Sequence, residues 1–203
     1  MTIHLHENAE LQVARKAILS AHALLVLLLG LTAFGAMVFL QKGSTPNFKT
    51  LSPSVVGLYS ILWLGMFICQ IFGYYKLAKV GRNLLIFRCI AFPYIVDALL
   101  SLFLLLAMPK ASITQIFNFK IITFFLYAYY SYKLFYELSR VTEDHYFRQG
   151  ILLLGFSLTL LLFIVGVGRG ALILFSFLFL VGMLVGWGMI FVGFFRLKQI
   201  NTP

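Results

Sequence analysis

Apolar residues run through six stretches of the chain, and short polar segments separate each stretch from the next. A helix needs about 20 residues to cross a hydrocarbon core, because it rises about 1.5 Å per residue. Each stretch is close to that length, so the pattern predicts six transmembrane helices. We expect these helices at 18–40, 55–77, 84–108, 119–138, 150–167 and 171–195.

The composition explains why these stretches must meet lipid rather than water. The chain has 62% hydrophobic residues, 11% charged residues and a mean hydropathy of +0.98. So few polar side chains cannot cover a water-soluble globule of 203 residues. The predicted layout is an N-terminal tail at 1–17, a single six-helix transmembrane domain at 18–198 and a C-terminal tail at 199–203.

A short pattern recurs at the ends of the second, fourth and sixth predicted helices. The three segments are YYKLAKV at 74–80, FYELSRV at 135–141 and FFRLKQI at 194–200. Their leucines lie 61 and 59 residues apart, at Leu77, Leu138 and Leu197. Interfacial aromatic and basic residues can recur without duplication, but the leucine and valine positions favour a repeated unit.

These repeats all point in the same direction across the membrane. The sequence therefore predicts an all-α integral membrane protein whose six transmembrane helices form three helical hairpins of about sixty residues, a parallel internal repeat. The predicted hairpins are 18–77, 84–138 and 150–195. In the sixth helix, Gly182 and Gly186 form a GxxxG step, which serves either packing within the bundle or a dimer.

Basic residues are unevenly divided between the two sides of the predicted bundle. Eleven of the 16 Lys and Arg residues lie on the side of the termini, which predicts an inner-membrane protein with both termini in the cytoplasm. The net charge of +10 then attracts anionic lipid rather than nucleic acid. The candidate anionic-lipid contacts are Lys76, Lys79, Arg82, Arg88, Arg140, Arg148, Arg169, Arg196 and Lys198.

Polar residues also mark the expected starts of two helices. Asn8 is the expected N-cap of a helix in the N-terminal tail. Thr142 is the expected N-cap of the fifth helix, with Glu143 and Asp144 in its electropositive first turn.

One acidic residue, Asp97, lies near the centre of the third predicted helix. An ionised Asp at that depth costs about 2.5 to 3.5 kcal/mol on insertion scales, so it needs a partner, water or a proton. We expect no basic residue at the same depth, because Lys120 lies near the outer face. Hydroxyl groups from the fourth and fifth helices are the expected partners, namely Tyr127, Tyr129, Tyr130 and Thr159. The sequence leaves open whether this is a proton or cation site or a polar contact between helices.

Part of the chain resembles a known group of proteins. The segments SRVTEDHYF at 139–147, RQGILLLGFSLTLLLFIVG at 148–166 and WGMIFVGFFRLK at 187–198 resemble small prokaryotic multi-span membrane proteins of the DUF996 type. The resemblance covers mainly the fourth to sixth predicted helices. It implies a bacterial or archaeal inner-membrane setting, and it supplies neither an established activity nor catalytic residues.

The sequence contains no motif typical of hydrolases, metalloproteases or nucleotide-binding proteins. Its two cysteines, Cys69 and Cys89, lack CxxC spacing, and we expect them to be reduced packing residues. We predict a protein without enzymatic activity, metal or cofactor that is a subunit, scaffold or lipid-interacting module, with a membrane-protein partner or as a homo-oligomer. The alternative is a small transporter or channel that uses Asp97. A lipid-modifying enzyme at Glu143, Asp144 and His145 is a more distant alternative.

Overall fold

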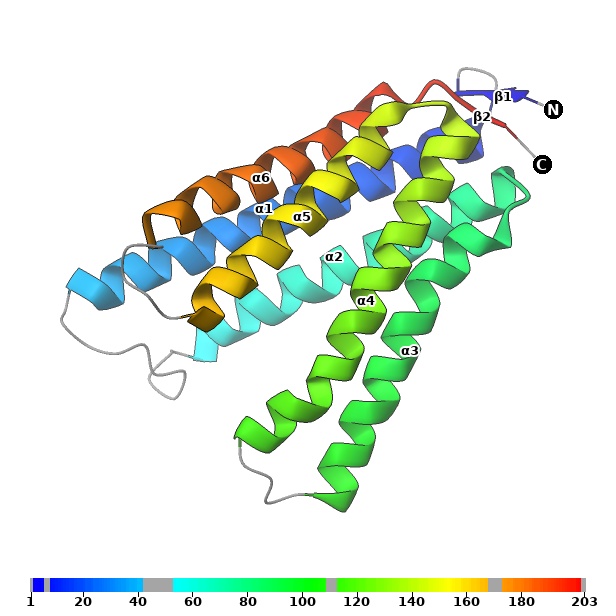
Figure 1. Cartoon of the computed structure of the whole chain (residues 1–203). Helices are drawn as coiled ribbons and strands as arrows, with labels where there is room; N and C mark the ends of the chain where they lie inside the picture. The colour runs from blue at the N-terminus through cyan, green and yellow to red at the C-terminus, as the bar shows by residue number, and fades with distance from the viewer. Residues whose placement is uncertain (1, 6–7, 42–52, 109–112, 168–172, 202–203) are drawn as a thin grey trace.

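The computed structural model describes residues 2–5, 8–41, 53–108, 113–167 and 173–201. Within these residues the chain forms six α-helices and two short β-strands (Figure 1). The helices are α1 (Ala9–Gln41), α2 (Pro53–Val80), α3 (Leu84–Ala107), α4 (Ile113–Thr142), α5 (His145–Val167) and α6 (Ile173–Arg196), and the strands are β1 (Thr2–His4) and β2 (Gln199–Asn201). The prediction of a helical membrane protein is confirmed, whereas the strands were not predicted.

Five of the helices are long and apolar enough to cross a membrane, namely α1, α2, α3, α5 and α6. The helix α4 is also long, at 30 residues, but it is not among these five. Its sequence contains several tyrosines together with Lys120 and Lys133, which lower its hydropathy. The described residues therefore form a polytopic membrane protein.

Three helices that follow a tail or a turn begin with the same kind of cap. The side-chain oxygens of Asn8, Asn83 and Asp144 accept hydrogen bonds from backbone N–H groups in the first turns of α1, α3 and α5, at 3.0, 3.1 and 2.9 Å. Such a cap satisfies one of the N–H groups that a helix start leaves without an intrahelical partner. The prediction for Asn8 is confirmed, and its helix continues directly into the first apolar stretch.

The prediction that Thr142 caps the fifth helix is wrong. Thr142 is the last residue of α4, and its hydroxyl donates to the carbonyl oxygen of Leu138 at 2.7 Å. Glu143 then adopts the left-handed region with φ of 57°, so the chain turns between Thr142 and Asp144. Arg82 has the same conformation, with φ of 48°, immediately before the cap Asn83 of α3. The two turns thus share one local geometry.

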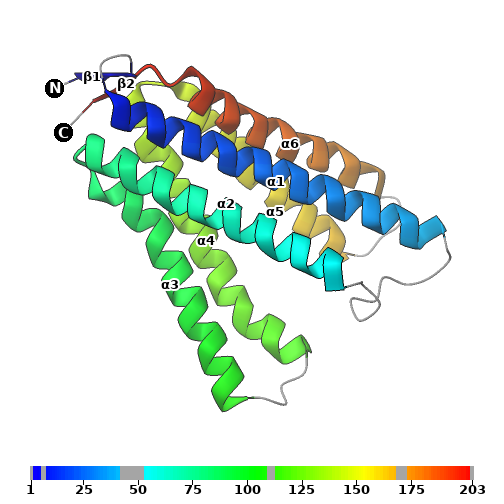
Figure 2. The same cartoon turned by 180° about the vertical axis from the view of Figure 1, so that it is seen from behind.

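The helices pack as three antiparallel hairpins that form a closed circle. The hairpins are α1–α2, α3–α4 and α5–α6, and further contacts join α2 to α3, α4 to α5 and α1 to α6. Figures 1 and 2 show α1, α2, α5 and α6 lying together, while the α3–α4 hairpin diverges from them. The strands β1 and β2 and the α2–α3 and α4–α5 turns lie at one end of the bundle, which we call the terminal end. The α3–α4 hairpin separates from the other helices with increasing distance from that end.

The buried core lies at the terminal end. Its centre is an aromatic cluster in which the ring of Phe194 contacts the rings of Tyr74, Phe135 and Phe147 at centroid distances of 5.9, 6.4 and 4.8 Å. The three leucines of the recurring pattern are also buried there, with exposed fractions of 0% for Leu77, 0% for Leu138 and 3% for Leu197. The recurring pattern therefore identifies core positions.

Glycines allow α5 and α6 to pack closely. A methyl group added at Gly186 would lie 2.8 Å from the carbonyl oxygen of Gly150 and 2.8 Å from the amide nitrogen of Leu154. One added at Gly182 would collide with the Ser157 hydroxyl. The structure thus uses the GxxxG step for packing within the bundle.

The two ends of the chain pair with each other. Strand β1 is antiparallel to β2, with Thr2 opposite Asn201, Ile3 opposite Ile200 and His4 opposite Gln199. The N–H group of Leu5 extends the pairing by donating to the carbonyl oxygen of Lys198 at 2.7 Å. Both predicted tails therefore carry regular structure, and both strands lie at the terminal end (Figure 1).

Candidate functional site

The candidate site is an ion pair between the two helices of the α3–α4 hairpin. The ammonium group of Lys120 on α4 lies 2.5 Å from a carboxylate oxygen of Asp97 on α3. The same ammonium group donates to the hydroxyl of Ser101 at 2.7 Å. About a third of each charged side chain is exposed, with 31% for Asp97 and 32% for Lys120.

This pair corrects the expectation that no basic residue reaches the depth of Asp97. The depth of Lys120 was judged from its position along the helix. Its backbone lies near the start of α4, at the end of the bundle away from the terminal end. A lysine has a flexible four-carbon stem, so its ammonium group can lie well away from its own Cα atom. Here the stem carries the charge to Asp97, which neutralises both groups within one hairpin.

Polar residues continue from the ion pair toward α2. Tyr94 lies one helical turn before Asp97 on α3, and its hydroxyl donates to the side-chain oxygen of Gln70 on α2 at 3.0 Å. The ring of Tyr94 packs edge-on against the ring of Tyr127 on α4, at a centroid distance of 5.5 Å. Side chains of α2, α3 and α4 thus form one polar line, which includes Gln70 and Tyr94 in addition to the predicted Tyr127.

The other predicted hydroxyl partners lie elsewhere. Tyr129 is 58% exposed and its ring contacts Tyr130, whose ring in turn contacts Phe92. Thr159 donates to the carbonyl oxygen of Gly155 in its own helix. Of the four predicted partners, Tyr127 reaches the neighbourhood of Asp97 through its ring contact with Tyr94, one helical turn before Asp97.

The predicted anionic-lipid contacts in the described residues all lie near the terminal end. Those that are exposed to solvent or lipid are Lys79, Arg82, Arg88, Arg140, Arg148, Arg196 and Lys198, and Lys76 is half-buried. Arg169 lies outside the described residues. Two of the arginines lie over aromatic rings, Arg148 over Tyr136 at 5.5 Å and Arg196 over Tyr146 at 4.9 Å.

Some of these cations are held by acidic residues that the sequence did not single out. Glu10 at the start of α1 accepts hydrogen bonds from Lys76 at 2.9 Å and Lys79 at 3.3 Å near the end of α2. Glu137, which is only 7% exposed, accepts from the Asn83 side chain at 2.6 Å and also from Arg140. The hydrogen bond to Glu137 raises the pKa of the Arg140 guanidinium. The contacts of Glu10 and of Asn83 thus join the start of one helix to the end of the other helix of the same hairpin.

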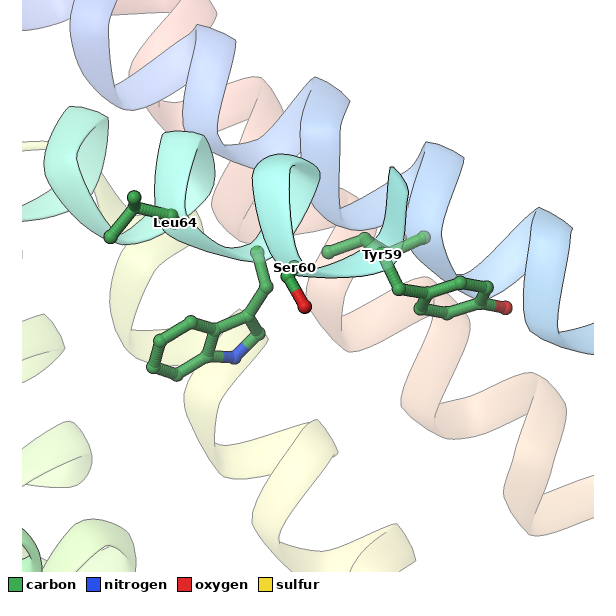
Figure 3. Close-up of a pocket in the computed structure, with 5 residues that line it drawn as sticks. Tyr59, Ser60 and Leu64 are labelled. Atoms are coloured by element: carbon green, nitrogen blue, oxygen red, sulfur yellow. The ribbon is translucent and has the colours of Figure 1, made fainter. Parts of the chain in front are cut away.

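A shallow groove of about 490 Å³ lies along α2, toward the end away from the termini. It is lined by Leu28 of α1 and by Tyr59, Ser60, Trp63 and Leu64 of α2. Figure 3 shows its labelled residues along α2, with Leu64 about one turn beyond the adjacent Tyr59 and Ser60. The groove is mainly apolar, so a lipid chain can fill it, and it offers no catalytic grouping.

In the part of the chain that the structure describes, no group of His, Cys, Asp and Glu side chains is arranged to hold a metal ion. Comparisons with protein-family models, with curated protein sequences and with solved structures give no match.

Proposed function

We propose that the chain is an inner-membrane protein without enzymatic activity that acts as a subunit, scaffold or lipid-interacting module, with both termini in the cytoplasm. The observation that carries this proposal is the pairing of Asp97 with Lys120 and Ser101 inside a single hairpin. A charged group within a bilayer marks a function by default, unless a partner accounts for it. Here the partner is present, and the pair serves as a polar contact between α3 and α4.

The proposal includes six membrane crossings. Antiparallel packing of α4 on α3, and the start of α5 at the terminal end, support a crossing by α4. Six crossings also agree with the pairing of the N- and C-terminal strands, because an even number returns the chain to its starting side. The excess of basic residues near this end supports its assignment to the cytoplasm.

The proposal also includes a threefold internal repeat. Counting from each cap, the third residue is fully buried in every hairpin, at Leu11, Ile86 and Phe147. One position before each recurring leucine, the second helix contacts the cap or the first turn of its partner helix in each hairpin, through Lys76 with Glu10, Glu137 with Asn83 and Arg196 with Tyr146. The contacts use different chemistry at matching positions, as expected for copies that have diverged.

The exposed cations near the terminal end support a further element, binding of anionic lipid headgroups. A headgroup phosphate can accept hydrogen bonds from arginines such as Arg148 and Arg196, which aromatic rings hold in place.

Native mass spectrometry of protein extracted with its own lipids tests the proposal. We expect a stoichiometric protein partner or a homo-oligomer with wild type, and the same assembly with Asp97→Asn combined with Lys120→Gln. A monomer that carries a small ligand, lost in the double variant, would contradict the proposal and favour a binding site at Asp97.

The second candidate function is a small transporter or channel. It is favoured by the polar line from Gln70 through Tyr94 and Tyr127 to Asp97, because such a line crosses three helices within the apolar region. This function requires water at the ion pair. A cysteine at Ser101, in a chain with Cys69 and Cys89 replaced by alanine, should then react with membrane-impermeant thiol reagents. If it stays unreactive from both sides, transport through this line is ruled out.

A further inference from the structure

Two of the three contacts between neighbouring hairpins are joined by the chain itself. The α2–α3 contact is joined by a turn at Gly81 and Arg82, and the α4–α5 contact by a turn at Glu143 and Asp144. The third contact, between α1 and α6, has no covalent connection, because α1 is the first helix and α6 the last. We call this contact the α1–α6 seam.

The strands β1 and β2 occupy the place where a third turn would lie. Strand β2 follows α6 and strand β1 precedes α1, and the two strands form an antiparallel ladder of three residue pairs. Leu5, Val80 at the end of α2 and Val141 in the last turn of α4 each lie three positions before a helix cap, and all three are buried, with exposed fractions of 6%, 7% and 4%. The paired strands thus lead into α1 as the turns lead into α3 and α5.

The ladder is also anchored to both covalent turns. Ile200 is fully buried and packs on Gly81, where an added methyl group would lie 2.8 Å from the Ile200 side chain. The side-chain amide of Asn201 donates to Glu143 at 2.7 Å, and its carbonyl oxygen accepts from the Thr2 hydroxyl at 2.9 Å. The paired strands therefore contact both covalent turns at the terminal end, in addition to joining the residues before α1 to those after α6.

The seam below the ladder is held mainly by aromatic contacts. The ring of His22 on α1 lies near the rings of Trp187, Phe191 and Phe194 on α6, at centroid distances of 5.8, 6.1 and 5.5 Å. Such contacts are non-covalent, and a two-stranded ladder of three residues is only marginally stable on its own. Of the three contacts between hairpins, the α1–α6 seam is the one that no covalent turn holds together.

We propose that the β1–β2 ladder is a clasp that closes the circle of hairpins, and that its release opens the α1–α6 seam sideways into the membrane. Opening exposes the aromatic cluster around Phe194 to lipid or to another membrane protein, while the α2–α3 and α4–α5 contacts stay joined. The clasp thereby selects which side of the bundle can open. This inference goes beyond the proposed function and does not depend on it.

A disulfide across the ladder tests the clasp. The substitutions His4→Cys and Gln199→Cys place thiols on directly paired residues, in a chain with Cys69 and Cys89 replaced by alanine. Paired residues of an antiparallel ladder have Cα atoms about 4.5 or 5.5 Å apart, within the range that a disulfide spans. Hydrogen exchange in lipid nanodiscs, measured by mass spectrometry, compares the oxidised protein with the same protein after reduction.

We expect oxidation to slow exchange at least tenfold in peptides from the seam, 9–22 and 187–196, with little change along α3. Ile200→Ala should speed exchange in the same peptides at least tenfold. Ile90→Ala is the matched control, because it makes the same substitution at a buried position of α3, a helix that packs against α2 and α4, and should leave the seam unaffected.

Three results would overturn the clasp. The first is failure of the two cysteines to form a disulfide under oxidising conditions. The second is exchange at the seam that neither the disulfide nor Ile200→Ala changes. The third is an equal slowing of hydrogen exchange at the α2–α3, α4–α5 and α1–α6 contacts by the disulfide. Such a result indicates a general gain of stability instead of opening at the α1–α6 seam.

Discussion

Replacing Gly186 by alanine tests how closely α5 and α6 pack. The added methyl group would lie 2.8 Å from backbone atoms of both Gly150 and Leu154. Backbone atoms of a helix cannot rotate away as a side chain can, so the two helices must move apart. Extra volume in a well-packed interior costs about 1–3 kcal/mol.

Gly188→Ala is the matched control on the same helix. No atom lies within 4 Å of a methyl group added at Gly188, so this variant has no packing cost. Both substitutions gain the same helix preference of alanine over glycine, about 0.5–1 kcal/mol. The difference between the two variants therefore isolates the packing cost, and we expect Gly186→Ala to be the less stable by about 1–3 kcal/mol.

The stability of both variants can be measured by reversible unfolding in mixed micelles, followed by circular dichroism. Equal stability of Gly186→Ala and Gly188→Ala would refute the close contact of α5 with α6. A loss of dimer with unchanged monomer stability in Gly186→Ala would instead assign the GxxxG step to contact between two copies.

Three further predictions concern polar contacts and use the same unfolding assay. Asp97→Asn and Lys120→Met should show a coupling of about 0.5–3 kcal/mol in a double-mutant cycle, and additive effects would mean that the pair does not form. Glu137→Leu should destabilise by about 1–3 kcal/mol because the buried amide of Asn83 loses its acceptor, and a smaller loss for Glu137→Gln would distinguish the hydrogen bond from shape. Asp144→Ala should cost about 0.5–2 kcal/mol and speed hydrogen exchange in the first turn of α5, and unchanged exchange there would contradict the cap assignment.

The helices could be predicted because long apolar stretches are a strong local signal, and the recurring leucines, singled out as markers of a repeat, turned out to be core positions. Leu77, Leu138 and Leu197 were singled out by spacing, and all three are buried. Asn8 was predicted as a cap because asparagine is among the residues preferred directly before the first turn of a helix.

Features that depend on distant or flexible groups could not be predicted in the same way. Strand β1 has three residues, and its partner lies at the other end of the chain, so no local pattern marks it. Thr142 and Asp144 are both suitable cap residues, and only the left-handed conformation of Glu143 decides between them. Lys120 was placed by its Cα position, although its long side chain determines where the charge lies.

The distribution of contacts along each hairpin follows from the medium. Lipid tails are as apolar as leucine, so apolar burial gives helices little reason to stay together inside a bilayer. At the terminal end the aromatic core and the strands hold the helices, but farther along each hairpin another kind of contact is needed. The structure provides one in every hairpin, through the Tyr59–Thr32 hydrogen bond, the Asp97–Lys120 ion pair and the close approach of Gly182 to Ser157. The α3–α4 hairpin diverges most from its neighbours, and it has the strongest of the three contacts because its two helices must hold each other.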